Sequence, residues 1–157
     1  RGALMYKQER VGKDGTVFNI YKLRTMIQDA ESNGAVFTVA NDVRVTRFGS
    51  FLRKTRIDEF PQFYNILKGD MAIIGPRPER PCFVNEIAEL MPFYETRHVI
   101  KPGLSGWAQV NYSYGESIQD SLIKLQYDLY YIKHRSVYLD LNISLRTITT
   151  VLFYRGQ

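Results

Sequence analysis

The stretch Arg56-Ile-Asp-Glu-Phe-Pro-Gln-Phe-Tyr-Asn-Ile-Leu-Lys-Gly-Asp70 places two carboxylates, Asp58 and Glu59, directly before a helical pattern. Apolar residues recur there at helical spacing, at Phe60, Phe63, Tyr64 and Leu67. Gly69 is a suitable helix stop, and Pro61 is tolerated only in the first turn of a helix. The pattern therefore predicts that both carboxylates lie at the N-terminus of a helix that ends near Gly69.

Two interpretations of the carboxylate pair follow from this placement. The pair is either a helix N-cap in favourable contact with the helix dipole, or it belongs to a reactive site. Neighbouring residues on a helix point about 100° apart, so one carboxylate can face a reacting phosphorus while the other holds a cation. The free N–H groups of a helix N-terminus also suit a phosphate.

A rigid basic turn, Gly75-Pro-Arg-Pro-Glu79, follows shortly after the pair. Arg77 carries a five-donor guanidinium that suits phosphate; the alternative is a structural arginine paired to Glu79. Lys22 and Arg24 alternate along one expected strand face, where they either add positive charge to a site or lie in solvent. An acidic pair, a helix start and a proline-framed arginine this close together indicate an anionic, metal-assisted reaction.

The composition is that of one folded domain, which we place over residues 1–157. Hydrophobic residues make up 45% and charged residues 24%, as in globular domains. Residues 1–60 carry 11 Lys and Arg against 7 Asp and Glu. This basic half favours phosphorylated substrates, an acidic membrane face or nucleic acid, but the chain has no recognisable nucleic-acid module. Cys82 is the only cysteine, so no intrachain disulfide can form, which fits a reducing compartment.

The N-terminal part of the chain predicts a β-hairpin. Residues 4–11 and 17–25 flank the turn-forming Gly12-Lys-Asp-Gly15, with alternating apolar and polar positions. A short polar helix is expected over residues 28–34, and a loop over residues 41–50.

The remainder of the chain is expected to be mainly helical. Helices are predicted over residues 81–98 and 118–134, and residues 139–154 are either helix or strand. Shorter pieces are a buried strand at 71–74, a loop at 101–106 and an extended segment at 107–110. Together these elements predict a helix-rich α+β domain, with an N-terminal hairpin followed by several helices and short strands.

Other chemistries find little support in the sequence. Ser105 does not lie in a Gly-x-Ser-x-Gly nucleophile elbow, and there is no phosphate-binding Gly-x-x-x-x-Gly-Lys loop. Two histidines and one cysteine cannot build a typical zinc site. Trp107 is expected to be a core anchor rather than a stacking platform.

Several motifs occur in a fixed order along nearly the whole chain. They are Lys7-Gln-Glu-Arg-Val-Gly12, Tyr21-Lys-Leu-Arg-Thr-Met26, Asp58-Glu-Phe-Pro-Gln62, Asn65-Ile-Leu-Lys-Gly-Asp70, Gly75-Pro-Arg-Pro-Glu79 and Lys101-Pro-Gly-Leu-Ser-Gly-Trp-Ala-Gln-Val-Asn111. In these motifs the chain closely resembles the catalytic domain of the bacterial sugar transferases, the monotopic phosphoglycosyl transferases.

The resemblance implies an enzyme that moves a sugar 1-phosphate from a UDP-sugar to polyprenol phosphate and releases UMP. Such enzymes initiate exopolysaccharide, lipopolysaccharide or related glycan assembly. Asp58 is implied as the nucleophile that forms a phosphosugar intermediate, and Glu59 as a ligand of Mg²⁺. A phosphate-binding or structural shell is implied for Lys22, Arg24 and Arg77, and supporting acidic roles for Asp128 and Asp140. A non-catalytic scaffold domain with the same fold is the rival hypothesis, which the intact carboxylate pair argues against.

The resemblance also implies a place at the cytoplasmic face of the bacterial inner membrane. Because the chain begins at Arg1 without Met and has no apolar run of about 18 residues, we expect a fragment whose membrane segment lies upstream. The apolar segment Leu139 to Phe153 is either a membrane-resting surface or ordinary core. Where many relatives have Gly-Arg-Asn after the Trp-Ala-Gln-Val-Asn motif, this chain reads Tyr112-Ser-Tyr-Gly115, similar to exopolysaccharide-type members. The oligomeric state stays open.

Overall fold

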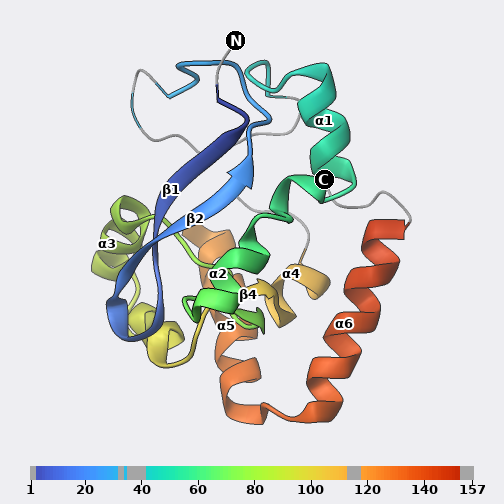
Figure 1. The fold of residues 1–157 in the computed structure, drawn as a ribbon. Helices are drawn as coiled ribbons and strands as arrows, with labels where there is room; N and C mark the ends of the chain where they lie inside the picture. Colours follow the sequence, from blue (N-terminus) through green and yellow to red (C-terminus); the bar gives the residue numbers. More distant parts are fainter. Residues whose placement is uncertain (1–2, 32–33, 35–41, 113–117, 153–157) are drawn as a thin grey trace.

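The computed structural model describes residues 3–31, 34, 42–112 and 118–152. Strands β1 (Met5–Val11) and β2 (Val17–Leu23) form the predicted antiparallel hairpin, joined through the 3-10 turn η1 (Lys13–Gly15). The hairpin runs diagonally across the molecule in Figure 1. Its inner side is anchored in the interior by Val11 and Ile20, which are both buried.

The segment after the hairpin differs from its prediction. Residues 28–31 form turns rather than the start of the polar helix predicted over 28–34, and Asp29 has a left-handed backbone (φ 61°) that interrupts helical geometry. The loop predicted at 41–50 instead leads into helix α1 (Arg47–Lys54). The hydroxyl of Thr46 caps this helix by accepting a hydrogen bond from Gly49 N at 2.9 Å.

Helix α2 (Gln62–Lys68) ends at Gly69, as predicted, with glycine in the left-handed region (φ 92°). Its orientation is the reverse of an ordinary amphipathic helix. The polar residues Gln62 and Asn65 are buried, while the apolar residues of the helical pattern are exposed: Phe60, Phe63, Tyr64 and Leu67. Asn65 fixes the helix to the hairpin, because its Nδ2 donates to Asn19 O at 2.8 Å and its Oδ1 accepts from Tyr21 N at 3.2 Å.

A small parallel sheet lies at the centre of the molecule. Strand β3 (Ala72–Ile74) pairs with β4 (Gly103–Ser105), so the strand predicted at 71–74 is confirmed over residues 72–74. Its predicted burial is wrong, because Ile73 is exposed, and the loop predicted at 101–106 is wrong over residues 103–105. The connection between the strands contains α3 (Pro81–Leu90) and the 3-10 helix η3 (Tyr94–Val99).

The single helix predicted over 81–98 is therefore wrong. Helix α3 ends before Met91, because Pro92 lacks an N–H donor and disfavours helical geometry in the residue before it. Phe93 then adopts a left-handed backbone (φ 66°). Residues 107–110, expected to be extended, belong to the short helix α4 (Trp107–Asn111).

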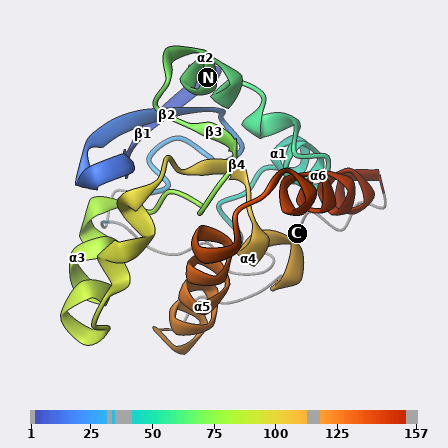
Figure 2. The same ribbon diagram turned by 90° about the horizontal axis from the view of Figure 1, so that it is seen from below.

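Two long helices complete the chain. Helix α5 (Ile118–His134) confirms the helix predicted over 118–134. Helix α6 (Val137–Leu152) settles the open choice in favour of helix over residues 139–152, and residues 153 and 154 lie outside the described residues. Seen from below, α3 lies on the left, α5 at the centre and α6 on the right, with α4 between α5 and α6 (Figure 2). The architecture is the expected helix-rich α+β domain.

The core consists of two clusters. The first joins β1, α3, η3 and α5, and its buried members are Val11, Phe83, Val84, Ile87, Met91, Tyr94 and Leu125. The second joins α5 and α6 through Tyr131, Leu139 and Ile143. Trp107 packs against the second cluster, as its core interpretation predicted. No helix within the described residues has both the length and the apolarity to cross a membrane.

Candidate active site

The two carboxylates lie in a short 3-10 helix, η2 (Ile57–Glu59), and not in the first turn of α2. This 3-10 helix follows Arg56, whose backbone is left-handed (φ 54°), and α2 begins only at Gln62. Phe60 and Pro61 separate the pair from that helix, so the predicted helix N-terminus is wrong. Both carboxylates are buried, and η2 lies in contact with strand β2 of the hairpin.

Glu59 is the electrostatic centre of the site. Its Oε1 accepts hydrogen bonds from Arg77 Nη2 at 2.8 Å and from Lys22 Nζ at 3.4 Å, and its Oε2 lies 3.6 Å from Arg56 Nη1. Burial alone would raise the pKa of Glu59, but the three cations outweigh it and hold the pKa well below its ordinary value. Glu59 is therefore ionised at neutral pH, and its charge holds basic side chains from three separate segments.

Asp58 has the opposite environment. It is as buried as Glu59, yet within residues 3–31, 34, 42–112 and 118–152 its carboxylate makes no hydrogen bond or ion pair. Burial, followed by the neighbouring charge of Glu59, raises the pKa of Asp58, although Lys22 and Arg53 oppose the rise. The site thus contains one carboxylate with free lone pairs and increased basicity beside one that is fully neutralised. Such an oxygen is available to attack an electrophile.

Lys22, whose side chain is 19% exposed, brings an ammonium group from β2 to the pair. Burial lowers the pKa of Lys22 to about 8, with a further lowering by Arg77 and an opposing effect of Glu59. At neutral pH the group is mostly protonated and close to titration. An ammonium in this position can attract a phosphate without a protein carboxylate neutralising it fully, because Glu59 also serves Arg77 and Arg56.

The loop over residues 75–79 holds Arg77 against Glu59 although it has no regular secondary structure. Each carbonyl from Pro76 to Glu79 accepts a hydrogen bond from another segment. The donors, in the order of those carbonyls, are Gly103 N (2.9 Å), Arg97 Nη2 (2.8 Å), Arg10 Nη1 (3.0 Å) and Val11 N (2.8 Å). Because the two prolines also fix φ, the loop is rigid and the guanidinium of Arg77 is preorganised.

Backbone contact explains why two of the glycine-containing motifs occur together. A Cβ on Gly103 would lie 2.1 Å from Gly75 N, and a Cβ on Gly75 would lie 2.5 Å from Lys101 O. The Lys101-Pro-Gly segment and the Gly-Pro-Arg-Pro turn can approach this closely only with glycine at both positions. β4 thereby supports the loop that carries Arg77.

The structure brings some of the predicted residues to the carboxylate pair and not others. Lys22 and Arg77 contact Glu59 directly, and the alternative pairing of Arg77 with Glu79 is not observed, because Glu79 pairs with Arg10 at 3.4 Å. Arg24 lies elsewhere on the hairpin: its Nε donates to Ala3 O at 2.8 Å and its guanidinium lies over the ring of Tyr6.

The two acidic residues predicted to support the site also differ in their positions. Asp128 on α5 forms a buried ion pair with Arg97 at 2.8 Å, and Arg97 in turn donates to the carbonyl of Arg77. Asp140 on α6 accepts from Tyr131 Oη at 2.7 Å and makes no contact with the carboxylate pair. Sequence reasoning gave no role to Arg56 or Arg97, which the structure places in and behind the site.

The carboxylate pair fits one mode of magnesium binding. Within the described part of the chain, no group of three or more His, Cys, Asp or Glu side chains is close enough to hold a metal ion. Magnesium often takes only one or two protein carboxylates, with substrate phosphates and water completing its coordination. Among the residues that the structure describes, the oxygens of Asp58 have no protein partner, whereas Glu59 would exchange one of its cation contacts for the metal. In the variant segment 112–115, residues 113–115 lie outside the described residues.

The chain is similar to known transferases over almost its full length. It is 51% identical over 151 residues to the UDP-N-acetylgalactosamine-undecaprenyl-phosphate N-acetylgalactosaminephosphotransferase of Aeromonas hydrophila, covering 96% of this chain and 36% of that protein. It is 41% identical over 154 residues to the UDP-glucose:undecaprenyl-phosphate glucose-1-phosphate transferase of Xanthomonas campestris pv. campestris, covering 96% and 32%. It is 37% identical over 157 residues to the uncharacterized sugar transferase EpsL of Bacillus subtilis (strain 168), covering 98% and 72%.

These relatives set the extent of the similarity. The chain spans about a third of the length of the Aeromonas and Xanthomonas proteins, and most of the length of the Bacillus protein. The family model described as bacterial sugar transferase matches residues 1–154, which include the carboxylate pair and the loop that carries Arg77. The chain therefore belongs to the bacterial sugar transferase family.

Proposed function

We propose that this chain catalyses the transfer of a sugar 1-phosphate from a UDP-sugar to a polyprenol phosphate such as undecaprenyl phosphate, with release of UMP. The observation that carries the proposal is the division of labour between the two buried carboxylates. Asp58 has a raised pKa and no hydrogen-bond partner in the described part of the chain, while Glu59 is neutralised by three cations. The names of the Aeromonas and Xanthomonas relatives supply the substrate classes.

The proposed reaction has two displacements at one phosphorus. An oxygen of Asp58 attacks the phosphorus that bears the sugar, the bond from that phosphorus to the bridging oxygen breaks, and UMP leaves. The phosphate oxygen of the polyprenol phosphate then attacks the same phosphorus, and the bond to Asp58 breaks. Lys22 and Arg77 attract the anionic diphosphate and reduce its repulsion of the attacking carboxylate.

Magnesium is the cofactor we propose for this site. Asp58 and Glu59 would hold it together with substrate phosphate oxygens, and the ion would supply further neutralisation of the diphosphate charge. The steps assigned to protein residues do not depend on the position of the ion. Glu59 keeps its role as the anchor of the basic side chains in either case.

UMP release from a panel of UDP-sugars tests the proposal. The panel begins with UDP-N-acetylgalactosamine and UDP-glucose, the donors in the names of the Aeromonas and Xanthomonas relatives. Each reaction contains polyprenol phosphate and magnesium, and parallel reactions lack the acceptor. We expect acceptor-dependent UMP release with one donor class. Absence of UMP release across the panel, from protein that is folded and lipid-bound, would contradict the proposal.

The pH dependence of turnover is expected to reflect the ionisation of Lys22. The acid form of this group is the useful cation, and the pKa of Lys22 lies near 8 in the free protein, so kcat/KM should fall as pH rises through about 8. Lys22→Arg keeps the charge at higher pH and should move this alkaline limb upward. A pH profile of UMP release for both proteins checks the prediction, and an identical limb in the two would contradict it.

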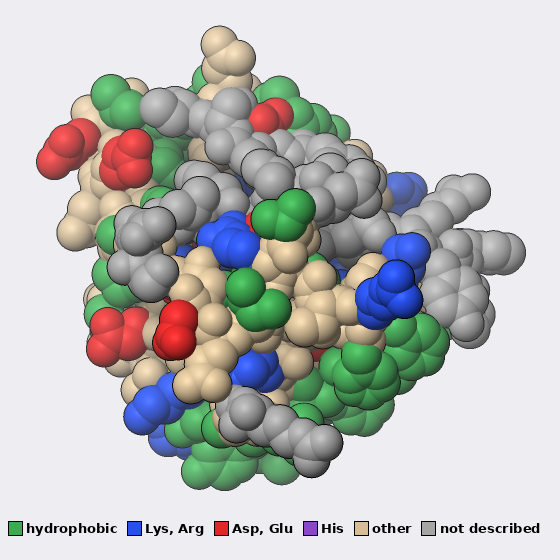
Figure 3. Space-filling view, turned by 90° about the horizontal axis from the view of Figure 1, so that it is seen from above, with side chains coloured by type: hydrophobic (Ala, Val, Ile, Leu, Met, Phe, Trp, Pro, Cys, Tyr) green, Lys and Arg blue, Asp and Glu red, His purple; other side chains and the backbone are tan. Residues whose placement is uncertain are grey.

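We also propose that the outer sides of α1 and α2 rest on the cytoplasmic face of the membrane. The exposed apolar side chains here belong to neighbouring segments: Phe48 and Phe51 on α1, Ile57 in η2, and Phe60, Phe63, Tyr64 and Leu67 at α2. In Figure 3 hydrophobic side chains gather along one edge of the molecule beside Lys and Arg side chains. Because Ile57 and Phe60 flank the carboxylates, the site lies at the edge of this surface, where a lipid phosphate can reach it.

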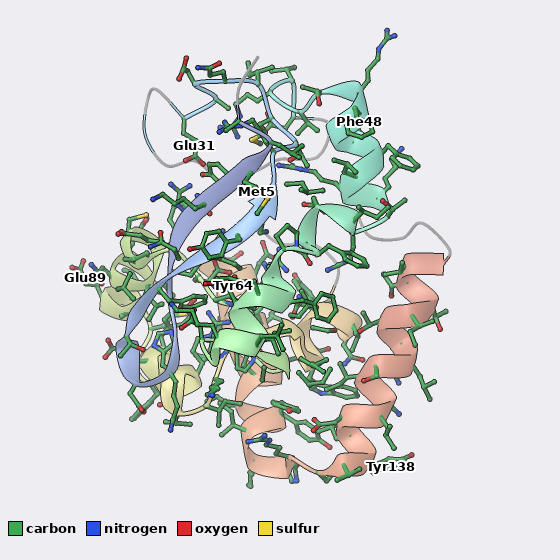
Figure 4. All side chains as sticks on the ribbon, in the orientation of Figure 1. Met5, Glu31, Phe48, Tyr64, Glu89 and Tyr138 are labelled. Atoms are coloured by element: carbon green, nitrogen blue, oxygen red, sulfur yellow. The ribbon has the colours of Figure 1, made fainter. Side chains whose placement is uncertain are left out.

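The segment that begins at Leu139 has two interpretations, a membrane-resting surface or ordinary core, and helix α6 has features of both. Leu139 and Ile143 are buried in the core, whereas Leu141, Leu145 and Ile148 are exposed. Figure 4 places Phe48 on α1 and Tyr138 at the beginning of α6, at opposite ends of the molecule in this view. We therefore assign the membrane surface to α1 and α2, which adjoin the carboxylates, and not to the exposed apolar side chains of α6.

Vesicle sedimentation distinguishes this surface from scattered exposed residues. The 157-residue chain should sediment with anionic vesicles, and Phe63→Ser with Leu67→Ser should weaken binding about tenfold through lost apolar burial. Lys54→Glu should weaken binding to anionic vesicles more than to neutral vesicles. Leu90→Ser, at a 57% exposed position on α3, is the matched control and should bind as wild type. A chain that stays in solution with both vesicle types would contradict the assignment.

A further inference from the structure

Arg97 is buried behind the active site and uses all three of its guanidinium nitrogens. Its side chain is 6% exposed and extends from η3. Nε donates to Asp128 Oδ2 at 3.1 Å, and Nη1 donates to Tyr94 Oη at 2.8 Å. Nη2 lies 2.8 Å from Asp128 Oδ2 and also donates to Arg77 O at 2.8 Å. The side chain therefore has one fixed position, set by η3, by α5 and by the loop over residues 75–79.

The ion pair between Arg97 and Asp128 is buried in the interior of the protein. Burial alone would lower the pKa of Arg97, but Asp128 outweighs it and the pKa is raised. A buried pair of this kind is sensitive to loss of either partner, because the remaining charge is left uncompensated. Asp128 and Tyr94 take three of the five N–H donors of the guanidinium, and the carbonyl of Arg77 accepts from a fourth.

The contact with Arg77 links this pair to the carboxylates. The carbonyl of Arg77 is held by Arg97, and the guanidinium of the same residue donates to Glu59 at 2.8 Å. Pro76 and Pro78 restrict the backbone on both sides, so the position of that carbonyl restricts the direction of the Arg77 side chain. A continuous series of contacts thus leads from Asp128 on α5 through Arg97 and Arg77 to Glu59.

We propose that Arg97, supported by Asp128 and Tyr94, is a positioning residue of the active site that fixes Arg77 for its contact with Glu59 and with the substrate diphosphate. The proposal rests on the proposed function for its substrate. Arg97 does not contact the carboxylate pair, so it acts only through Arg77. This makes the effect of Arg97 on turnover conditional on the presence of Arg77, whereas its effect on stability is not.

A double-mutant cycle in UMP release tests this conditional effect. Lysine keeps the charge of Arg97 but replaces the planar fork by one nitrogen, so Arg97→Lys should lower kcat/KM about tenfold in the wild-type background. In an Arg77→Ala background the same change should cost less than about twofold, because the group being positioned is absent. Tyr94→Phe removes one hydroxyl and keeps the core ring, and it should give a smaller loss with the same dependence on Arg77.

A matched control separates positioning from general destabilisation. Arg44 also pairs with a carboxylate, that of Asp42, and also donates to a backbone carbonyl, that of Ala30 at 3.2 Å. Arg44→Lys should lower the melting temperature while leaving kcat/KM unchanged. An Arg97→Lys loss of the same size in both backgrounds, or a loss in Arg44→Lys that matches it, would overturn the proposal and leave Arg97 as a structural residue.

Hydrogen exchange supplies a measurement that does not depend on catalysis. Peptides covering residues 75–80 should exchange faster in Arg97→Lys and Tyr94→Phe than in wild type, and at the wild-type rate in Arg44→Lys. If the exchange rate of this loop is unchanged in both Arg97→Lys and Tyr94→Phe, the positioning role of Arg97 is overturned. If wild type releases no UMP from any donor, the proposed function fails, and the exchange data still decide whether Arg97 holds the loop.

Discussion

Asp58→Asn should abolish sugar-phosphate transfer while leaving the protein at least as stable as wild type. The side chain keeps its shape but loses the carboxylate that we propose as the nucleophile, so turnover should fall by at least about a thousandfold. The pKa of Asp58 is raised in the folded protein, which means that folding disfavours the ionised carboxylate at neutral pH. Removing this charge should therefore keep or increase the melting temperature. UMP release and thermal unfolding, measured on the same preparation, check both parts.

Asp42→Asn is the matched control, because Asp42 is as buried as Asp58, at 8%. Its side-chain hydrogen bonds to Arg44 lower the pKa of Asp42 to about 2, so folding favours its ionised form. The control should lose stability and keep its turnover, the reverse of Asp58→Asn. If Asp58→Asn turns over substrate near the wild-type rate, or if it unfolds as readily as Asp42→Asn, the assigned role of Asp58 is wrong.

Glu59→Gln should lower both the stability of the protein and its turnover. Three cations, whose side chains are 19%, 25% and 35% exposed, lose their shared anion, so stability should fall by less than the roughly 3 kcal/mol of a fully buried pair. Arg77 and Lys22 lose their anchor, so the chemical step should slow on the order of a hundredfold, and its magnesium dependence should shift if Glu59 is a ligand. A wild-type rate with an unchanged magnesium curve would contradict this role.

The acid stability of the protein checks Glu59 in a second way. Its pKa in the folded state lies below the ordinary value of 4.5, so its stabilising contribution is complete above pH 4.5 and is lost as pH falls below it. Glu59→Gln should flatten this part of the stability curve. Glu31→Gln, which breaks a 2.8 Å pair with Arg80 away from the site, should leave turnover unchanged. If wild type and Glu59→Gln lose the same amount of stability as the pH falls below 4.5, the assignment of Glu59 to buried ion pairs is contradicted.

Local sequence signals predicted the elements whose formation depends on neighbouring residues. The hairpin follows from its Gly-Lys-Asp-Gly turn, and α5 follows from sustained helical spacing. The break after α3 was also signalled, by Pro92, but the apolar periodicity on both sides concealed it. The segment 107–110 was predicted as extended because a helix as short as α4 has too few turns to show periodicity.

Other features depend on long-range contacts that a single sequence does not display. Lys22 and Arg77 could be predicted as members of the site from their motifs, but their common contact with Glu59 joins residues far apart in the chain. Arg97 and Asp128 are separated by 31 positions, and no periodicity or motif connects them. The apolar spacing in α2 was correct for a helix and misleading for its orientation, because the buried polar contacts of Asn65 turn the apolar side outward.

Intact-mass spectrometry of the protein mixed with its UDP-sugar, without polyprenol phosphate, tests the central claim most directly. Wild type should gain the mass of one sugar phosphate, and peptide mapping should place the group on Asp58. Asp58→Asn should gain no mass, while Arg97→Lys should form the same adduct more slowly. Addition of polyprenol phosphate should remove the group from the wild-type protein. Acceptor-dependent UMP release without any adduct, or an adduct on another residue, would contradict the covalent role of Asp58.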